Sequence, residues 1–209
     1  MKAFIYTGGS LRLDNIHERP QKGDLTIAAD AGLLNARALG IKPDILVGDF
    51  DSLGLPDKNA AKETVTLPVE KDDTDTQYAV KLALERGADE LVIIGGLFGR
   101  LDHTLSNLAI LEDLNSRHIR AIITDGQNRA RFIRNDGVIL PRDGFAYFGL
   151  VAADPKVKGV SVDGCKYPLK NAKLIRTNQY AVSNEIVGNC ALIEVRRGGV
   201  WVIESNDAI

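Results

Sequence analysis

The stretch "PDILVGDFDSL" (residues 43–53) sets an apolar run directly before two carboxylates, Asp49 and Asp51, with only Phe50 between them. Side chains of a strand alternate between its two faces, so in an extended chain both carboxylates would project from one face. At an effective dielectric of roughly 20, two unit charges ~4 Å apart repel each other by about 4 kcal/mol. The stretch therefore predicts either a cation bound between the carboxylates or a solvated turn after a strand.

Apolar runs of strand length alternate with helix-like segments through about residue 125. The predicted strands are 3–6, 25–29, 44–48, 65–69, 90–96 and 120–124. Residues 74–87 and 103–118 have the pattern of helices, and Gly87 is a stop signal for the first of them. This alternation is typical of βα units around a largely parallel sheet.

After about residue 126 the pattern changes to short apolar runs separated by Gly, Asp and Asn, with no helical segment between them. The predicted strands are 130–135, 137–141, 145–153, 159–164, 173–177, 181–188, 191–198 and 200–205. Such spacing is typical of an antiparallel sandwich or barrel. The expected architecture is an N-terminal Rossmann-like α/β domain, residues 1–126, followed by an all-β sandwich domain, residues 127–209.

Composition narrows the possible functions of the 209-residue chain. A net charge of -2 argues against a general nucleic-acid binder, which needs a concentrated basic field. The segment "MKAFIYTGGS" (1–10) is too short in its apolar part for a signal peptide, and no run approaches the roughly 18–20 apolar residues of a membrane span. We therefore expect a cytoplasmic protein that acts on small molecules, without nucleic-acid or membrane partners.

The two cysteines, Cys165 and Cys190, have neither C-x-x-C spacing nor a neighbouring histidine. This disfavours a zinc site and a redox centre. We interpret both as small buried residues in a reducing compartment, and the sequence leaves a disulfide between them open.

Carboxylates and glycines follow the predicted parallel strands, where open α/β sheets bind their ligands. In chain order they are Gly8 and Gly9, Asp30, Asp49 and Asp51, "EKDDTD" (70–75), and "GGLFGRLDH" (95–103). Each has a structural explanation: Asp72 or Thr74 as a helix cap, Asp75 as a partner of the helix dipole, Asp102 as the cap of the next helix. If these carboxylates gather at one rim of the sheet, their mutual repulsion requires divalent cations. Oxygen ligands of this kind favour Mg²⁺, which also binds the phosphates of a substrate. The sequence thus predicts phosphoryl chemistry.

The glycine-rich stretch "GGLFGR" (95–100) fits this chemistry, since a backbone without Cβ atoms can approach phosphate oxygens and Arg100 can donate forked hydrogen bonds to them. The chain has no G-x-x-x-x-G-K-[ST] and no G-x-G-x-x-G motif. A nucleotide would therefore be held differently from one in a P-loop or a dinucleotide-binding enzyme.

Six segments of the sequence, in this order, resemble motifs of the thiamine pyrophosphokinase family: "AADAG", "GIKPDILVGDFDS", "KDDTDTQYA", "GGLFGRLDH", "GCKYPL" and "SNE". The resemblance implies an α/β domain, a β-sandwich, and a homodimer with active sites between the subunits. It also implies a reaction that requires Mg²⁺ and moves the diphosphate of ATP to the hydroxyethyl group of thiamine, with release of AMP.

Carried over residue by residue, the resemblance suggests specific roles. The implied catalytic residues are Asp49, Asp51, Asp72, Asp75, Arg100 and Asp102, the first four as Mg²⁺ ligands. The implied ATP-binding residues are Asp30, Gly95, Gly96, Gly99, Arg100, Asp102 and His103. Thiamine would contact Ser183 and Asn184, in the partner subunit's site. A cationic thiazolium would also favour an aromatic contact, for which Tyr167 is the candidate.

Three further residues receive expectations of their own. Asp73 is expected to be a bystander among the carboxylates. Phe98 stands where the family motif G-G-x-G-G-R has a glycine, so the loop departs from the motif at that position. Trp201 is interpreted as a packing residue rather than a thiamine contact.

Several alternatives remain open from the residues alone. The substrate could be another heterocyclic alcohol, such as a hydroxymethylpterin. The chain could also be a nucleotide sensor without turnover, or a metal-dependent phosphohydrolase with water as the acceptor. Which group orients or deprotonates the attacking hydroxyl, Asp102 or a metal-bound carboxylate, is undecided at this point.

Overall fold

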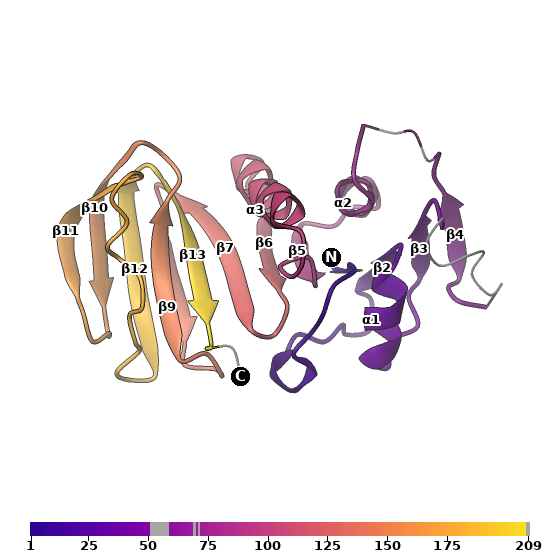
Figure 1. The fold of residues 1–209 in the computed structure, drawn as a ribbon, viewed down its shortest axis with the longest axis horizontal. Helices are drawn as coiled ribbons and strands as arrows, with labels where there is room; N and C mark the ends of the chain where they lie inside the picture. Colours follow the sequence, from indigo (N-terminus) through magenta and orange to yellow (C-terminus); the bar gives the residue numbers. More distant parts are fainter. Residues whose placement is uncertain (51–58, 69, 71, 208–209) are drawn as a thin grey trace. The chain divides into compact units, whose positions relative to one another are not determined.

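The computed structural model describes residues 1–50, 59–68, 70 and 72–207. The chain divides into two compact units, Met1–Gly126 and Gln127–Ile209, which we call the α/β unit and the β unit (Figure 1).

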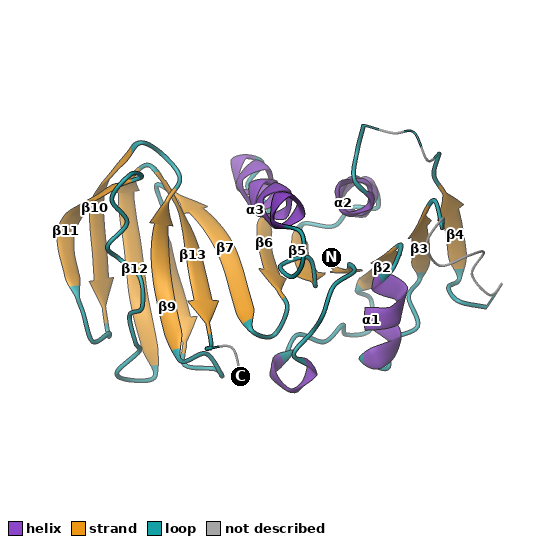
Figure 2. Cartoon of the chain, viewed as in Figure 1, coloured by secondary structure: helices purple, strands orange, loops and turns teal. Residues whose placement is uncertain are grey.

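The α/β unit is built on parallel strands in the order β4-β3-β2-β1-β5-β6, and every neighbouring pair in this order is parallel. The strands are β1 (Lys2–Tyr6), β2 (Leu25–Ala29), β3 (Ile45–Gly48), β4 (Glu63–Thr66), β5 (Glu90–Ile94) and β6 (Arg120–Thr124). The helical elements are η1 (Leu13–Asn15), α1 (Gly32–Ala38), α2 (Asp75–Glu85) and α3 (Leu101–Ser116). Figure 2 shows α1 on one face of the sheet and α2 with α3 on the other. The strand order changes direction at β1, so the rim beyond β1 and β5 is the expected ligand site of this unit.

Helix α1 lies unusually close to the sheet at its first residue. A Cβ atom on Gly32 would lie 1.9 Å from the carbonyl oxygen of Tyr6, so only glycine allows the two backbones this separation. Leu33 and Ala36 then enter an apolar cluster with Phe4, Tyr6 and other core residues.

The two predicted helices of this unit are confirmed, with one correction. Helix α2 is followed by Gly87 at a φ of 87°, the left-handed conformation of a glycine stop. Helix α3 begins at Leu101 with Arg100 at the N-cap position, so Asp102 lies in the first turn and does not cap the helix. Helix α1 was not among the predicted elements.

The alternation argument for Asp49 and Asp51 is wrong in its premise. Strand β3 ends at Gly48, and Phe50 is buried at a φ of 58°, which is not an extended conformation. The strand pleat therefore does not continue through the D-x-D word. Asp51 lies outside the described residues.

The β unit contains two antiparallel sheets, with strand orders β7-β13-β9 and β11-β10-β12-β8. The strands are β7 (Asn128–Arg134), β8 (Gly137–Pro141), β9 (Tyr147–Ala152), β10 (Lys156–Asp163), β11 (Leu169–Ile175), β12 (Cys190–Arg197) and β13 (Gly199–Ser205). One apolar cluster takes side chains from both sheets, for example Leu150 and Val202 from the first and Val160 and Ile193 from the second. The predicted fold class, an α/β part and an antiparallel sandwich, is confirmed.

Two expectations for the β unit are wrong. Residues 181–188 form no strand; they make only isolated bridges, at Asn184 with Phe148 and at Ile186 with Cys165. The cysteines are not buried: Cys165 is half-buried, Cys190 is exposed, and both are free thiols.

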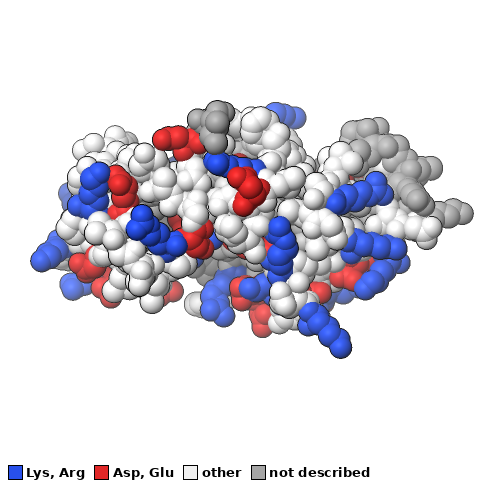
Figure 3. Space-filling model, turned by 90° about the horizontal axis from the view of Figure 1, so that it is seen from below, with Lys and Arg blue, Asp and Glu red and all other residues white. Residues whose placement is uncertain are grey.

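The surface in Figure 3 shows Lys and Arg side chains interspersed with Asp and Glu. Among the described residues, no helix is long and apolar enough to cross a membrane.

Candidate functional site

Two glycine turns meet where the neighbouring strands β1 and β5 end. The N–H of Thr7 donates to the carbonyl of Ile94 at 2.8 Å, and the N–H of Gly96 donates to the carbonyl of Gly8 at 3.1 Å. Gly95 adopts a φ of 100°, and a Cβ atom there would lie 2.7 Å from the carbonyl oxygen of Thr7. Glycine is required at this position because the two turns touch.

A pocket of about 230 Å³ opens beside these turns. It brings together Gly96, Arg100 and His103 of the predicted ATP-binding set. Its lining residues are Thr7, Gly8, Gly9, Thr76, Gly96, Phe98, Arg100, His103 and Asn107. Thr7, Thr76 and Asn107 were not predicted as site residues. The sequence does place the polar Thr7 directly after a predicted strand, and Asn107 about one helical turn after the candidate His103, and either position could have indicated the residue.

Arg100 and Asp102 form an exposed, forked ion pair at this pocket's edge. Arg100 donates to the two Asp102 oxygens at 2.6 and 3.2 Å, and the N–H of His103 donates to the same carboxylate at 3.0 Å. The hydrogen bonds from Arg100 hold the pKa of Asp102 at about 2. Asp102 is therefore ionised at neutral pH, and such a low pKa makes it a poor proton acceptor.

The carboxylates before α2 separate into different environments. Thr74 is the N-cap: its side chain accepts from the N–H of Gln77 at 3.2 Å, and the Gln77 side chain accepts from the N–H of Thr74 at 2.9 Å. The capping explanation therefore holds for Thr74 and not for Asp72, which is exposed. Asp73 forms an ion pair with Lys81 at 2.5 Å, and Asp75 lies in the first turn of the helix.

Asp30 and Asp49 follow neighbouring strands whose ends are in close contact. The N–H of Asp30 donates to the carbonyl of Val47 at 2.7 Å, and a Cβ atom on Gly48 would lie 3.2 Å from the Asp30 Cα. The pairing of β2 with β3 therefore brings the loops of these two aspartates to the same rim.

A preformed metal cage is absent from the described residues, since no three His, Cys, Asp or Glu side chains there are close enough to hold an ion. Mg²⁺ does not need such a cage, because it commonly takes one or two carboxylates and completes its shell with water and phosphate oxygens. Asp30 and Asp49, whose loops meet at this rim, carry carboxylate oxygens of the kind that this chemistry uses.

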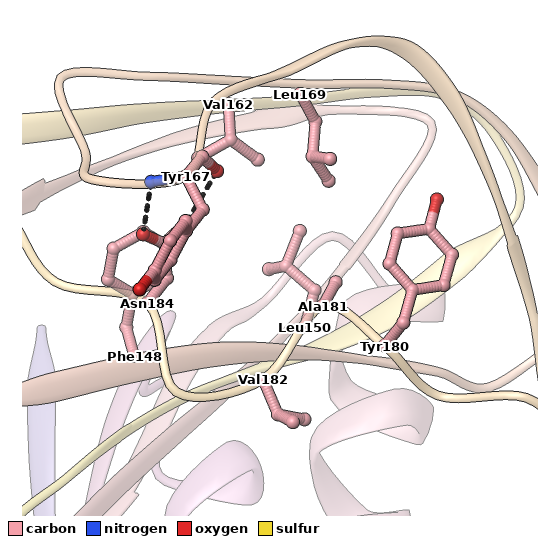
Figure 4. Close-up of a pocket in the computed structure, with 9 residues that line it drawn as sticks. All are labelled: Phe148, Leu150, Val162, Tyr167, Leu169, Tyr180, Ala181, Val182 and Asn184. Atoms are coloured by element: carbon pink, nitrogen blue, oxygen red, sulfur yellow. Dashed lines mark hydrogen bonds between the residues drawn. The ribbon is translucent and has the colours of Figure 1, made fainter.

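In the β unit, Tyr167 and Asn184 line one apolar pocket of about 120 Å³ (Figure 4). The Asn184 side chain accepts from the N–H of Tyr167 at 3.0 Å and donates to its carbonyl at 2.9 Å. The Tyr167 ring is exposed, and Figure 4 places it across the pocket from Tyr180. Asn184 thus fixes the backbone that carries the Tyr167 ring.

Ser183 lines a different pocket, of about 410 Å³, which shares Phe148 and Val182 with the first. Ser183 has a φ of 57°, so the chain turns sharply between the two pockets. Trp201 lines neither of these two pockets; its ring packs edge-on against Phe132 with centroids 5.6 Å apart.

Comparison with known proteins gives matches along most of the chain. The sequence model described as "Thiamin pyrophosphokinase, catalytic domain" matches residues 16–123, and "Thiamin pyrophosphokinase, vitamin B1 binding domain" matches residues 138–200. A thiamine pyrophosphokinase of Bacillus subtilis (strain 168) is 28% identical over 188 residues, which is 88% of each chain. Thiamin pyrophosphokinase 1 of Caenorhabditis elegans is 28% identical over 210 residues, 95% of this chain and 85% of the relative.

Solved structures agree with these matches. A crystal structure of thiamine pyrophosphokinase from Bacillus subtilis superposes with a TM-score of 0.87 at 24% identity over the whole of both chains, which shows a shared fold. A thiamin pyrophosphokinase family protein from Enterococcus faecalis superposes with a TM-score of 0.81 at 27% identity, also over the whole of both chains. The protein described here therefore belongs to the thiamin pyrophosphokinase family.

Proposed function

We propose that this chain transfers the diphosphate group of ATP to the hydroxyethyl group of thiamine, giving thiamine diphosphate and AMP. The observation that carries the proposal is the succession of a catalytic-domain match and a vitamin B1 binding-domain match along one chain. In this proposal residues 1–126 bind ATP and Mg²⁺, and residues 127–209 bind thiamine and form the dimer.

The pocket at the glycine turns is proposed to hold the ATP phosphates. Attack by an alcohol on a phosphorus atom needs alignment and charge neutralisation more than covalent catalysis. Arg100, which lines the pocket and carries five N–H donors, would stabilise the phosphate oxygens in the transition state. The proposed ATP-binding set is Asp30, Gly95, Gly96, Gly99, Arg100, Asp102 and His103.

The carboxylates of the rim are proposed to hold Mg²⁺ through Asp49, Asp51, Asp72 and Asp75. When bound, the ion would neutralise phosphate charge during the transfer. Because the pKa of Asp102 is about 2, we assign to Asp102 the orientation of Arg100 and not the removal of the hydroxyl proton.

Tyr167, Ser183 and Asn184 are proposed to bind thiamine. Attraction between a cationic thiazolium and an aromatic face contributes about 0.5–2 kcal/mol. Lys166 already lies 5.6 Å from the Tyr167 ring centroid and is held by Glu185 at 2.6 Å, so thiamine would use the opposite ring face. Asn184 would act by holding the Tyr167 backbone.

The decisive assay supplies purified protein with ATP, Mg²⁺ and thiamine, and measures AMP and thiamine diphosphate. Equal amounts of the two products are expected. Formation of ADP, or hydrolysis of ATP that does not depend on thiamine, would contradict the proposal, and a hydroxymethylpterin as acceptor tests the alternative substrate. The family matches do not favour that alternative, because the second domain is the vitamin B1 binding one.

Two variants test the carboxylates against a matched control. Asp49→Asn and Asp72→Asn should lose activity while they keep the wild-type melting temperature. Asp73→Asn changes a carboxylate that is paired with Lys81 and should retain activity. Unchanged kinetics in Asp49→Asn and Asp72→Asn would mean that these two carboxylates have a structural role and do not hold Mg²⁺.

The proposed homodimer can be tested by mixing inactive variants. If Ser183 acts in the partner subunit's site, a mixture of Asp49→Asn and a Ser183 variant should form heterodimers with one intact site. Random assortment predicts recovery of about a quarter of the wild-type activity, since half the dimers would be mixed. No recovery would place both residues in the site of the same subunit. We also propose a cytoplasmic location, which cell fractionation would test.

A further inference from the structure

The turn after β1 has a regular pattern of hydrogen bonds that the proposed function does not yet use. The carbonyls of Thr7 and Gly9 accept hydrogen bonds from the Asn35 side-chain amide at 2.7 and 2.9 Å. The carbonyl between them, of Gly8, accepts from the N–H of Gly96 at 3.1 Å. Three consecutive carbonyls of this turn are thus bound to the protein.

The N–H groups of the same three peptide units belong to Gly8, Gly9 and Ser10. A trans peptide is planar, so its N–H points opposite to its carbonyl. No residue in the described part of the chain accepts a hydrogen bond from these three N–H groups. Gly9 and Ser10 are exposed and Gly8 is half-buried, so a ligand can reach them.

The turn after β5 repeats the arrangement with a different amide. The carbonyl of Gly96 accepts from the Asn107 side chain at 2.9 Å, and the N–H of Leu97 in the same peptide unit has no acceptor among the described residues. Asn107 is buried, and a Cβ atom on Gly96 would lie 2.6 Å from its amide nitrogen. Asn107 therefore packs directly on the turn that it binds.

Both turns line the pocket that holds Arg100. Gly8, Gly9, Gly96 and Asn107 are all lining residues. Carbonyl oxygens would repel a phosphate, whereas free backbone N–H groups in a concave turn attract anions. The side-chain amides of α1 and α3 withdraw the carbonyls from the pocket side and leave the N–H groups available.

We infer that Gly8–Ser10 is a second phosphate-binding turn, and that Asn35 and Asn107 are positioning residues that orient this turn and the Gly95–Leu97 turn for the polyphosphate of the nucleotide. The inference rests on the proposed function for the identity of the ligand. It adds to the proposed ATP site the Gly8–Ser10 turn and two uncharged residues, Asn35 and Asn107. Recognition is of the phosphates and not of the base, because backbone N–H groups make up the turn.

The test measures binding of ATP with Mg²⁺, and of tripolyphosphate as a probe without a base, by titration calorimetry. Asn35→Ala and Asn107→Ala should each weaken both ligands by about tenfold, equivalent to about 1.4 kcal/mol. Asn35→Asp keeps the shape of the side chain, loses the donor and adds a negative charge, so it should weaken binding more than Asn35→Ala. The KM for thiamine should stay unchanged in all three variants.

Asn15→Ala is the matched control. The Asn15 amide donates to the carbonyl of Gly126 at 2.7 Å, and Asn15 is buried in the same unit but does not line the pocket. Asn15→Ala should lower the melting temperature about as much as Asn35→Ala and Asn107→Ala do, because each variant removes a side-chain amide that binds a backbone carbonyl. It should leave the affinities for ATP and tripolyphosphate at their wild-type values.

Three outcomes would overturn the inference: wild-type affinity in Asn35→Ala and Asn107→Ala, an equal loss in Asn15→Ala, or a loss for ATP without one for tripolyphosphate. If one variant fails to fold, the other decides. Failure of the proposed function looks different, because wild-type protein would then bind polyphosphate at the turn without forming AMP from ATP and thiamine.

Discussion

Arg100 in the α/β unit and Arg129 in the β unit both form forked ion pairs with carboxylates, but their surroundings differ. The side chains of Arg100 and Asp102 are 73% and 65% exposed, and they form a simple pair. The side chains of Arg129 and Glu204 are 6% and 2% exposed, and Arg129 also binds Asp143. An exposed arginine has N–H groups that a ligand can reach while the pair is kept, whereas a buried pair is fixed by the cost of leaving a charge unpaired.

The buried cluster of the β unit is densely connected. Arg129 donates two hydrogen bonds to Glu204 and two to Asp143, at 2.6–3.0 Å, and its guanidinium lies 4.7 Å from the Phe145 ring centroid. Arg131 donates to Glu204 at 2.8 Å. Burial alone would lower the pKa of Arg129, but its hydrogen bonds to Glu204 and Asp143 outweigh burial and raise it. The Arg129 guanidinium therefore keeps its charge in the folded protein.

The largest expected effect is on stability, in Arg129→Ala. Removing this guanidinium leaves the buried Glu204 with Arg131 as its one cationic partner among the described residues, which should cost about 3–5 kcal/mol of unfolding free energy. Denaturant unfolding measures it. Arg117→Ala, which breaks an exposed pair with Asp113, is the control and should be nearly neutral. A loss in Arg129→Ala as small as in the control would erase the contrast between the two units.

Arg100→Ala should show the opposite pattern. We expect kcat to fall by about 100- to 1000-fold, the usual effect of removing a donor that stabilises transition-state charge. The melting temperature should hardly change, because both members of the pair are exposed. Steady-state kinetics and thermal unfolding of the same preparation give both values. Lost stability with retained kcat would assign Arg100 to the fold and not to the site.

Thr74→Ala should have a smaller effect on stability than Arg129→Ala. Thr74 caps helix α2, whose first turn carries Asp75, so this variant tests how much the α/β unit depends on a single cap. Loss of its bond to the N–H of Gln77 should cost about 1 kcal/mol. Thr74→Ser retains the hydroxyl and should recover most of that loss in denaturant unfolding. Equal stability of the two variants would mean that the capping box contributes little.

The smallest effect concerns pH. The folded-state pKa of Asp102, about 2, is below its ordinary value of 3.8, so the stabilisation by Arg100 is present above pH 3.8 and is lost as pH falls toward 2. Melting temperatures of wild type and Asp102→Asn should differ slightly at pH 5 and converge near pH 2. A difference that grows on acidification would contradict the assigned sign.

Where sequence patterns were strong, they predicted the elements well, and the failures have physical causes. The runs 25–29 and 120–124 became β2 and β6 without change because they are apolar and bounded by polar residues. Helix α1 was missed because it is short and has no side-chain cap; its contact with the sheet stabilises it instead. Residues 181–188 alternate like a strand, but the left-handed turn at Ser183 interrupts the extended backbone.

Of the residues that line the pocket at the glycine turns, Gly96, Arg100 and His103 belong to the predicted ATP-binding set, whereas Thr7, Thr76 and Asn107 do not. Arg100 and His103 were identifiable because their chemistry suggests phosphate binding. Asn35 and Asn107 act on the site by binding the carbonyls of Thr7 and Gly96, which lie many residues away in the sequence. Local patterns contain no record of such contacts, so only the fold reveals them.

Gly32 and Asn35 lie three residues apart on α1, and so on nearly the same side of the helix. The absence of a side chain at residue 32 sets how deep α1 lies, and that depth decides whether the Asn35 amide can reach the β1 turn. A larger residue at 32 would lift the helix and release the two carbonyls that Asn35 binds, nearly one helical turn away. Laboratory evolution that seeks new acceptor alcohols should therefore keep position 32 invariant, although Gly32 is not among the lining residues of the pocket at the glycine turns.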